Sequence, residues 1–191
     1  RLLESLEKFM PGDTPGFLDR AKRATLLCKA DLNTQMVFEF PELQGIIGGY
    51  YAKSSGEPEE VAIAIKEHYR PAFAGDRVPS TDLGAFVALV DKLDTIVACI
   101  GVGLIPTGSE DPYALRRHAM SIIQILIEKD IPLAIGHMVQ IGIDQLGDKA
   151  KLKSDEIRQH VLDLFRQRLK TLLSSEGYDY DVIDAVLATP I

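Results

Sequence analysis

The segment most informative about the fold is STDLGAFVALVDKLDTIVACI, residues 80–100, because it predicts one long helix that is apolar on almost every side. Ser80 or Thr81 offers a hydroxyl that can accept a hydrogen bond from the first turn and so cap the helix. Apolar side chains then follow at spacings of three and four residues: Leu83, Phe86, Val87, Leu89, Val90, Leu93, Ile96, Val97 and Ile100. A helix that is apolar all round is normally buried. We therefore expect a helical domain built around this segment.

The same helical spacing recurs on both sides of this segment, and the alternation typical of β-strands is almost absent. Towards the N-terminus, an apolar stripe runs through Phe17, Ala21, Ala24, Cys28 and Leu32. Pro58 begins another helix, which Pro71 ends. Beyond residue 100, helices are expected at about 113–129, 133–146 and 154–174, with a cap at Ser154, and around Val182–Leu187. The sequence predicts an all-α protein, with a core in residues 1–130 and a C-terminal helical extension in residues 131–191.

Size and charge limit the kinds of partner that the chain can bind. The 191 residues are 46% hydrophobic and 26% charged, which is ordinary for a globular domain, and the net charge is −7. A negative net charge opposes nonspecific adhesion to nucleic acid. Any nucleic-acid contact must then come from one of three basic clusters: Arg20-Lys22-Arg23-Lys29, Arg116-Arg117 and Lys149-Lys151-Lys153. A charge cluster is usually the solvated face of a helix, which is the alternative for each of them.

Cysteine usage and hydropathy suggest a cytoplasmic protein. The two cysteines, Cys28 and Cys99, do not form a CxxC pair, and both lie in segments expected to be helix interiors. The longest apolar run, from Ile96 to Ile105, is too short to span a bilayer, and no signal-peptide pattern opens the chain. We expect no membrane association.

The most specific local pattern is GLIPTGSEDPYALRR, from Gly103 to Arg117. Asp111 followed by Pro112 is typical of a helix N-cap beside a first-turn proline, so a helix is predicted to begin there. The preceding Pro and Gly predict a turn or irregular loop. The pattern places Arg116 and Arg117 just inside a capped helix. A simple connection between helices with a solvated arginine pair is the alternative.

Three carboxylates fall on apolar helical faces. Asp31 follows the stripe that contains Cys28, and Asp91 and Asp94 lie within the long apolar helix. Burial of a carboxylate costs several kcal/mol unless it is paired, hydrogen-bonded or bound to metal. His68, at the end of another predicted helix, is a possible partner. The alternative is that lysines such as Lys29 and Lys92, His68 or helix caps satisfy the three carboxylates.

The Gly103–Arg117 pattern resembles a motif of the beta subunit family of bacterial glycyl-tRNA synthetases, the type with separate alpha and beta chains. Four further segments are similar to the same family in the same order: FEFPELQGIIGGYYA (38–52), EHYRPAFAGDRVP (67–79), LVDKLDTIV (89–97) and GYDYDVIDAVLA (177–188). Members of this family are several times longer than 191 residues. The resemblance therefore implies that the chain is an internal fragment of such a subunit.

Two segments also resemble the HD phosphohydrolase fold, a helical bundle that binds a divalent metal through His and Asp side chains. Asp91 stands where the last Asp of that fold would be, and Ala30-Asp31 stands where the His-Asp pair would be. Alanine has no atom that can bind a metal. The resemblance implies an HD-like bundle with additional C-terminal helices and a degenerate, empty metal site at Asp31, His68, Asp91 and Asp94, with no catalytic residue.

The resemblance to the synthetase family implies a noncatalytic domain that supports tRNA binding and subunit architecture. Its expected partners are tRNA(Gly), the alpha subunit, which holds the adenylate-forming site, and the remaining beta-subunit domains. ATP and Mg would be used by the whole enzyme, with no cofactor bound by this domain. The expected tRNA contacts are Arg116 and Arg117, and more weakly Lys92. The alternatives are a metal-dependent nucleotide phosphohydrolase and a structural spacer that makes contacts through GIIGGYY and the last helix.

Overall fold

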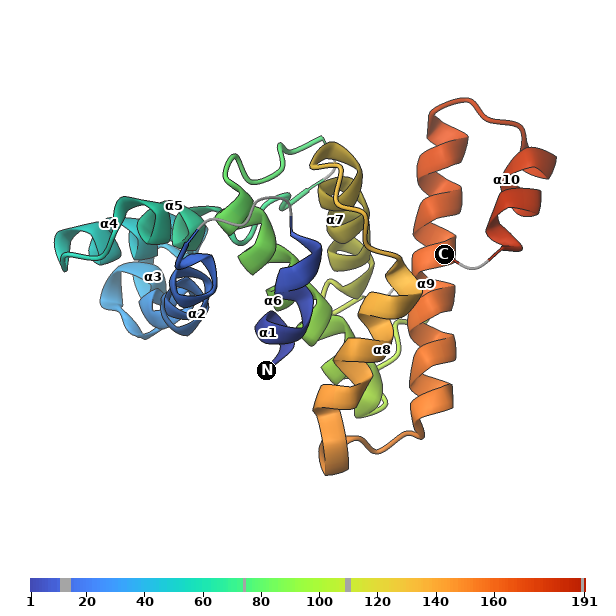
Figure 1. Cartoon of the computed structure of the whole chain (residues 1–191), viewed down its shortest axis with the longest axis horizontal. Helices are drawn as coiled ribbons and strands as arrows, with labels where there is room; N and C mark the ends of the chain where they lie inside the picture. The colour runs from blue at the N-terminus through green and yellow to red at the C-terminus, as the bar shows by residue number, and fades with distance from the viewer. Residues whose placement is uncertain (11–14, 74, 109–110, 190) are drawn as a thin grey trace. The chain divides into compact units, whose positions relative to one another are not determined.

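The computed structural model describes residues 1–10, 15–73, 75–108, 111–189 and 191. Its described part consists of helices and connecting loops without a strand, which confirms the prediction of an all-α protein (Figure 1). The α-helices are α1 (Leu2–Leu6), α2 (Phe17–Leu27), α3 (Gln35–Glu39), α4 (Ile46–Ser54), α5 (Glu59–Glu67), α6 (Asp82–Gly101), α7 (Leu115–Glu128), α8 (Ile135–Leu146), α9 (Ser154–Ser175) and α10 (Tyr180–Leu187). Short 3-10 turns are η1 (Glu7–Phe9), η2 (Ala30–Asn33), η3 (Pro41–Leu43) and η4 (Gly147–Lys149). In the described ranges, no helix combines the length and the apolar composition that crossing a bilayer requires.

The chain folds into two compact units. The first consists mainly of residues 3–91 with 124–131, and the second mainly of residues 92–123 with 132–191. Helices α6 and α7 contribute residues to both units. The division into domains at residue 130 stays a prediction.

Helix α6 confirms the interpretation of the segment at residues 80–100. The hydroxyl Oγ1 of Thr81 accepts a hydrogen bond from the backbone N–H of Gly84 at 3.0 Å, so Thr81 caps the helix. Ser80 instead donates its hydroxyl to the carboxylate of Glu67. The apolar side chains of α6 from Leu83 to Val90 are all buried, as are those of Leu93, Ile96, Val97 and Ile100.

The predicted stripe beginning at Phe17 is interrupted after Cys28. Helix α2 ends at Leu27, and the turn η2 and the short helix α3 follow, so Leu32 is exposed. The hydroxyl of Thr34 accepts a hydrogen bond from the backbone N–H of Val37, which caps α3 and separates it from α2. The predicted continuation of the first helix through Ala30-Asp31 is therefore wrong, because the turn η2 follows α2 and the Thr34 cap begins a new helix.

Close helix packing explains the glycines of GIIGG. Helix α4 packs against α5 in the first unit. A Cβ atom on Gly49 would lie 2.7 Å from the backbone oxygen of Ala62, nearer than a carbon can approach. Gly45 precedes α4 with a positive φ of 75°, which glycine adopts without strain. The absence of side chains at these glycines therefore allows α4 to pack closely against α5.

The second unit contains the predicted C-terminal helices. Helix α8 packs against α9, and α10 against α9. A Cβ atom on Gly142 of α8 would lie 3.0 Å from Val97, which shows how closely α8 approaches the second half of α6. Ser154 is the first helical residue of α9 and not its cap, which is Lys153, and Gly177 ends α9 with a φ of 90°.

Candidate functional site

The loop between α6 and α7 contains the pattern at residues 103–117, and Asp111 organises it. The two carboxylate oxygens of Asp111 accept hydrogen bonds from the backbone N–H groups of Leu115 at 2.7 Å and Arg116 at 3.0 Å. Asp111 thus caps α7, but α7 begins at Leu115, later than predicted. The reason is that Pro112 and Tyr113 form a turn, and Ala114 takes a positive φ of 57° before the helix begins. Ser109 and Glu110 of the pattern lie outside the described residues.

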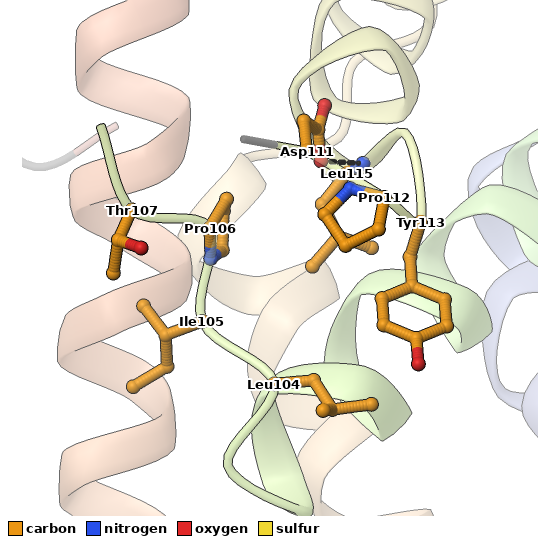
Figure 2. A pocket seen from close by; sticks show the side chains of 8 residues that line it. All are labelled: Leu104, Ile105, Pro106, Thr107, Asp111, Pro112, Tyr113 and Leu115. Atoms are coloured by element: carbon orange, nitrogen blue, oxygen red, sulfur yellow. Dashed lines mark hydrogen bonds between the residues drawn. The ribbon is translucent and has the colours of Figure 1, made fainter. Parts of the chain in front are cut away.

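The two arms of this loop enclose a small pocket, drawn in Figure 2. Its volume is about 100 Å³, and eight residues line it: Leu104, Ile105, Pro106, Thr107, Asp111, Pro112, Tyr113 and Leu115. Figure 2 shows Thr107, Pro106 and Ile105 on one arm and Asp111, Pro112 and Tyr113 on the other, with the space between them. The Tyr113 side chain is 49% exposed, whereas Leu115 is buried at the base of α7. The pocket therefore has a mostly apolar lining, with Asp111 and Thr107 as polar side chains and the half-exposed ring of Tyr113 at its edge.

The two arginines of the pattern have different roles. Arg116 is half-buried, and its Nη2 donates a hydrogen bond to the carbonyl oxygen of Gly108 at 2.8 Å, which ties α7 to the loop. Arg117 is exposed, and its side chain forms no hydrogen bond or ion pair with any other residue that the structure describes. Arg117 is therefore the arginine that can reach a ligand in solution.

Lys92, the third expected tRNA contact, is buried with 2% of its surface exposed, so it cannot reach a ligand from this conformation. The lysines at 149, 151 and 153 are all exposed, and within the described ranges none of them forms an ion pair. The backbone N–H groups of Lys151 and Leu152 donate to the carbonyl oxygen of Gly101 at 2.8 and 3.1 Å. These bonds hold the lysine segment at the end of α6, where the loop to α7 begins.

The first basic cluster is neutralised by ion pairs. Arg20 contacts Glu60 at 2.7 Å, Lys22 contacts Glu4 at 2.6 Å, and Lys29 contacts Asp91 at 2.9 Å. Nε and Nη2 of Arg23 both donate hydrogen bonds to the carboxylate of Glu57, and this interaction lowers the pKa of the Glu57 carboxyl. Each cation of this cluster thus has a carboxylate partner.

Three of the four residues expected at a degenerate metal site lie in one neighbourhood of the first unit. Asp31 is 2% exposed, and its Oδ2 accepts a hydrogen bond from the backbone N–H of Gly45 at 2.7 Å. His68 is buried, with its Nδ1 2.7 Å from the carbonyl oxygen of Ile65 and its ring against Tyr69. Burial, together with the nearby charges of Asp31 and Asp91, raises the pKa of the Tyr69 phenol to about 12.

Asp94 does not belong to this neighbourhood. It is exposed and lies in the second unit, so the prediction that it is a buried carboxylate is wrong. The helical period carries it past the apolar face that holds Val90 and Val97.

These residues do not fit a divalent metal. Gly45 and Lys29 already contact the carboxylates of Asp31 and Asp91, and residue 30 is an alanine. In the part of the chain that the structure describes, no three His, Cys, Asp or Glu side chains are grouped as a metal site requires.

Comparison with known proteins gives a consistent result. A family model described as "Glycyl-tRNA synthetase beta subunit" matches residues 1–188. The chain is 50% identical over 182 residues to a protein of Halalkalibacterium halodurans, with 94% of this chain and 26% of that protein covered. It is 46% identical over 191 residues to a protein of Shouchella clausii, with 97% of this chain and 28% of that protein covered. Both relatives are named "Glycine--tRNA ligase beta subunit", and the chain spans about a quarter of their length.

Proposed function

The chain belongs to the glycyl-tRNA synthetase beta subunit family, and we propose that it is a noncatalytic helical part of such a subunit that helps to hold tRNA(Gly). The whole enzyme would join glycine to tRNA in an ATP-dependent reaction. ATP and Mg would bind outside this domain, in which we infer an HD-like bundle without its metal. The alpha subunit and the remaining beta-subunit domains would be its protein partners.

The observation that carries this proposal is the exposed, unpaired Arg117 at the capped start of α7. In a chain of net charge −7, Arg117 is an exposed cation that has no carboxylate partner in the described structure, so its charge is available to an anion. Guanidinium groups bind phosphate oxygens well, and phosphate contacts position a nucleic acid without reading its sequence. Arg117 would therefore bind the tRNA backbone.

Arg116 supports this contact indirectly. Adjacent residues of a helix point about 100° apart, so the two arginines cannot both face one ligand in the same way. The hydrogen bond from Arg116 to Gly108 fixes the loop beside α7. We assign Arg116 to positioning and Arg117 to tRNA contact. The exposed lysines at 149, 151 and 153, held near the end of α6, are a second candidate phosphate contact and replace Lys92 in this role.

The alternative of a metal-dependent phosphohydrolase has less support. Such an enzyme needs a metal ion with open coordination positions to activate water. One oxygen of each carboxylate that would hold the ion is engaged, Asp31 Oδ2 by the backbone N–H of Gly45 and Asp91 Oδ2 by Lys29, and residue 30 offers no ligand atom.

Charge reversal of Arg117 tests the proposal in the full-length beta subunit assembled with its alpha subunit. We expect Arg117→Glu to weaken tRNA binding and to reduce the slope of log affinity against log salt by up to about one unit. Arg77→Glu is the matched control, because Arg77 is also exposed and also lacks an ion pair with any described residue, but lies in the first unit. Equal tRNA affinity and equal salt slope for the two variants would rule out a phosphate contact at Arg117.

A further inference from the structure

We propose that the pocket between the two arms of the α6–α7 loop receives one unpaired nucleobase of the tRNA, with the Tyr113 ring stacked on it. This inference rests on the proposed function, since it places a base next to the phosphate contact at Arg117. It assigns a role to the eight residues that line the pocket, which the phosphate contact alone does not use.

The size of the pocket suits one flat ring. Its volume of about 100 Å³ is well below the roughly 300–1,000 Å³ of sites that enclose a whole small ligand. Apolar side chains of Leu104, Ile105, Pro106 and Leu115 form most of the wall. Figure 2 shows Tyr113 and Leu104 together at one end of the space, with Pro106 and Pro112 facing each other across it. A planar aromatic group is the shape that such a slot accommodates.

The charges distinguish a base from a phosphate. Asp111 lines the pocket, so a phosphate inside it would be repelled by a carboxylate. Each oxygen of that carboxylate accepts one backbone N–H and keeps a further lone pair for an amino group of a base. The positive charge of Arg117 lies outside the pocket, on the first turn of α7. This arrangement places the base inside the loop and its phosphate on the helix.

The base must come from a single-stranded part of the tRNA. Bases in an RNA duplex are stacked and paired, and proteins that bind individual bases take them from loops, bulges and ends, where they stack on aromatic side chains. Tyr113 at the opening of the pocket is such an aromatic platform, because half of its surface is free. The 3′ end and the loops of tRNA are the two possible sources of the base.

The test uses tRNA with the fluorescent base 2-aminopurine and the full-length beta subunit assembled with its alpha subunit. One tRNA carries the probe in its single-stranded 3′ end, and two others carry it in the anticodon loop or the D loop. Stacking quenches 2-aminopurine, so we expect quenching on binding for one of these positions, which identifies the source of the base. Tyr113→Leu should abolish that quenching and weaken binding by about 5- to 140-fold, the range that follows from loss of one stacked base.

Two control variants and the salt dependence of binding show whether the effect is specific to the Tyr113 ring. Tyr113→Phe keeps the ring and should retain both the quenching and the affinity. Tyr178→Leu removes another exposed tyrosine of the second unit and should change neither. Because Tyr113 carries no charge, Tyr113→Leu should leave the salt slope of binding unchanged, in contrast to Arg117→Glu.

Different experimental results would reject the base pocket and the phosphate contact, so the two proposals can be tested separately. Unchanged quenching and affinity in Tyr113→Leu would overturn the base pocket, and a reduced salt slope in Arg117→Glu would still support the tRNA contact. Quenching at none of the three probe positions would also overturn the pocket. An unchanged salt slope in Arg117→Glu, with quenching that depends on Tyr113, would overturn the phosphate contact and support the base pocket.

Discussion

The basic clusters of the sequence are used in different ways in the two units. In the first unit, the cations of the Arg20–Lys29 cluster each contact a carboxylate, and several of these pairs join segments far apart in the sequence. In the second unit, Arg117 and the lysines at 149, 151 and 153 are exposed without an ion pair to any described residue. Basic clusters of the sequence therefore differ in their capacity to bind an anion. The difference lies in the nearby carboxylates and not in the number of cations.

The largest effect that we predict is a loss of stability when Asp31, in the first unit, is replaced. Asp31→Ala removes the acceptor of the buried Gly45 N–H and should lower the free energy of unfolding by about 1–3 kcal/mol. Asp31→Asn keeps an oxygen that can accept the same bond and should lose less. Urea unfolding of the chain measures both variants. Equal stability of Asp31→Ala and the unchanged chain would show that this carboxylate is not part of the structural framework.

A smaller effect is expected in the second unit, at Asp111. Asp111→Ala leaves the N–H groups of Leu115 and Arg116 without their cap and should lower the free energy of unfolding by about 0.5–2 kcal/mol. In the assembled enzyme it should also weaken tRNA binding, because the direction of Arg117 depends on where α7 begins. Asp31→Ala is the control for this measurement, and it should leave the salt slope of tRNA binding unchanged. If Asp111→Ala altered stability without altering tRNA affinity, the loop would be a purely structural connection.

The smallest effect is expected from the Arg23–Glu57 pair, and it should depend on pH. The hydrogen bond from Arg23 lowers the pKa of Glu57 from its ordinary value of 4.5. A lowered carboxyl pKa contributes stability above the unfolded-state value, and this contribution is lost as the pH falls through the folded-state pKa. Arg23→Gln should therefore be slightly less stable than the unchanged chain near neutral pH and equally stable in acid.

Arg117→Gln provides the matched measurement for this pair. Because Arg117 has no carboxylate partner in the described structure, its replacement should not change the pH dependence of urea unfolding. Arg23→Gln should in turn leave tRNA affinity unchanged. A pH-dependent loss of stability in Arg117→Gln would mean that Arg117 is ion-paired, and the contrast between the two units would be lost.

Much of the fold follows from local patterns that the sequence contains. The spacing of apolar residues predicts α6, and the hydroxyl of Thr81 caps it as expected. The resemblance to the synthetase beta subunit family is confirmed over residues 1–188. The helix boundaries near Asp31 and Asp111 were predicted less well. At both places, a side-chain hydrogen bond to backbone a few residues away decides where the next helix begins.

The candidate site was only partly predictable. The pattern at residues 103–117 indicates a capped helix with an arginine pair, and the structure confirms that Asp111 caps α7. The pocket was not predicted, because it depends on how the two arms of the loop face each other. The exposure of Asp94 and the burial of Lys92 were not resolved by the periodicity either, since α6 is apolar on several faces at once.

The helical class, the family and the positions of most helices could be predicted from the amino-acid sequence, because spacing, caps and turns act over a few residues. Which cations are available to a ligand depends on the folded chain. Arg23 and Glu57 are 34 positions apart, and Lys29 and Asp91 are 62 positions apart, so no local sequence pattern predicts these ion pairs. A charge is available to a partner only when folding brings no opposite charge to it, and that depends on the packing of distant segments.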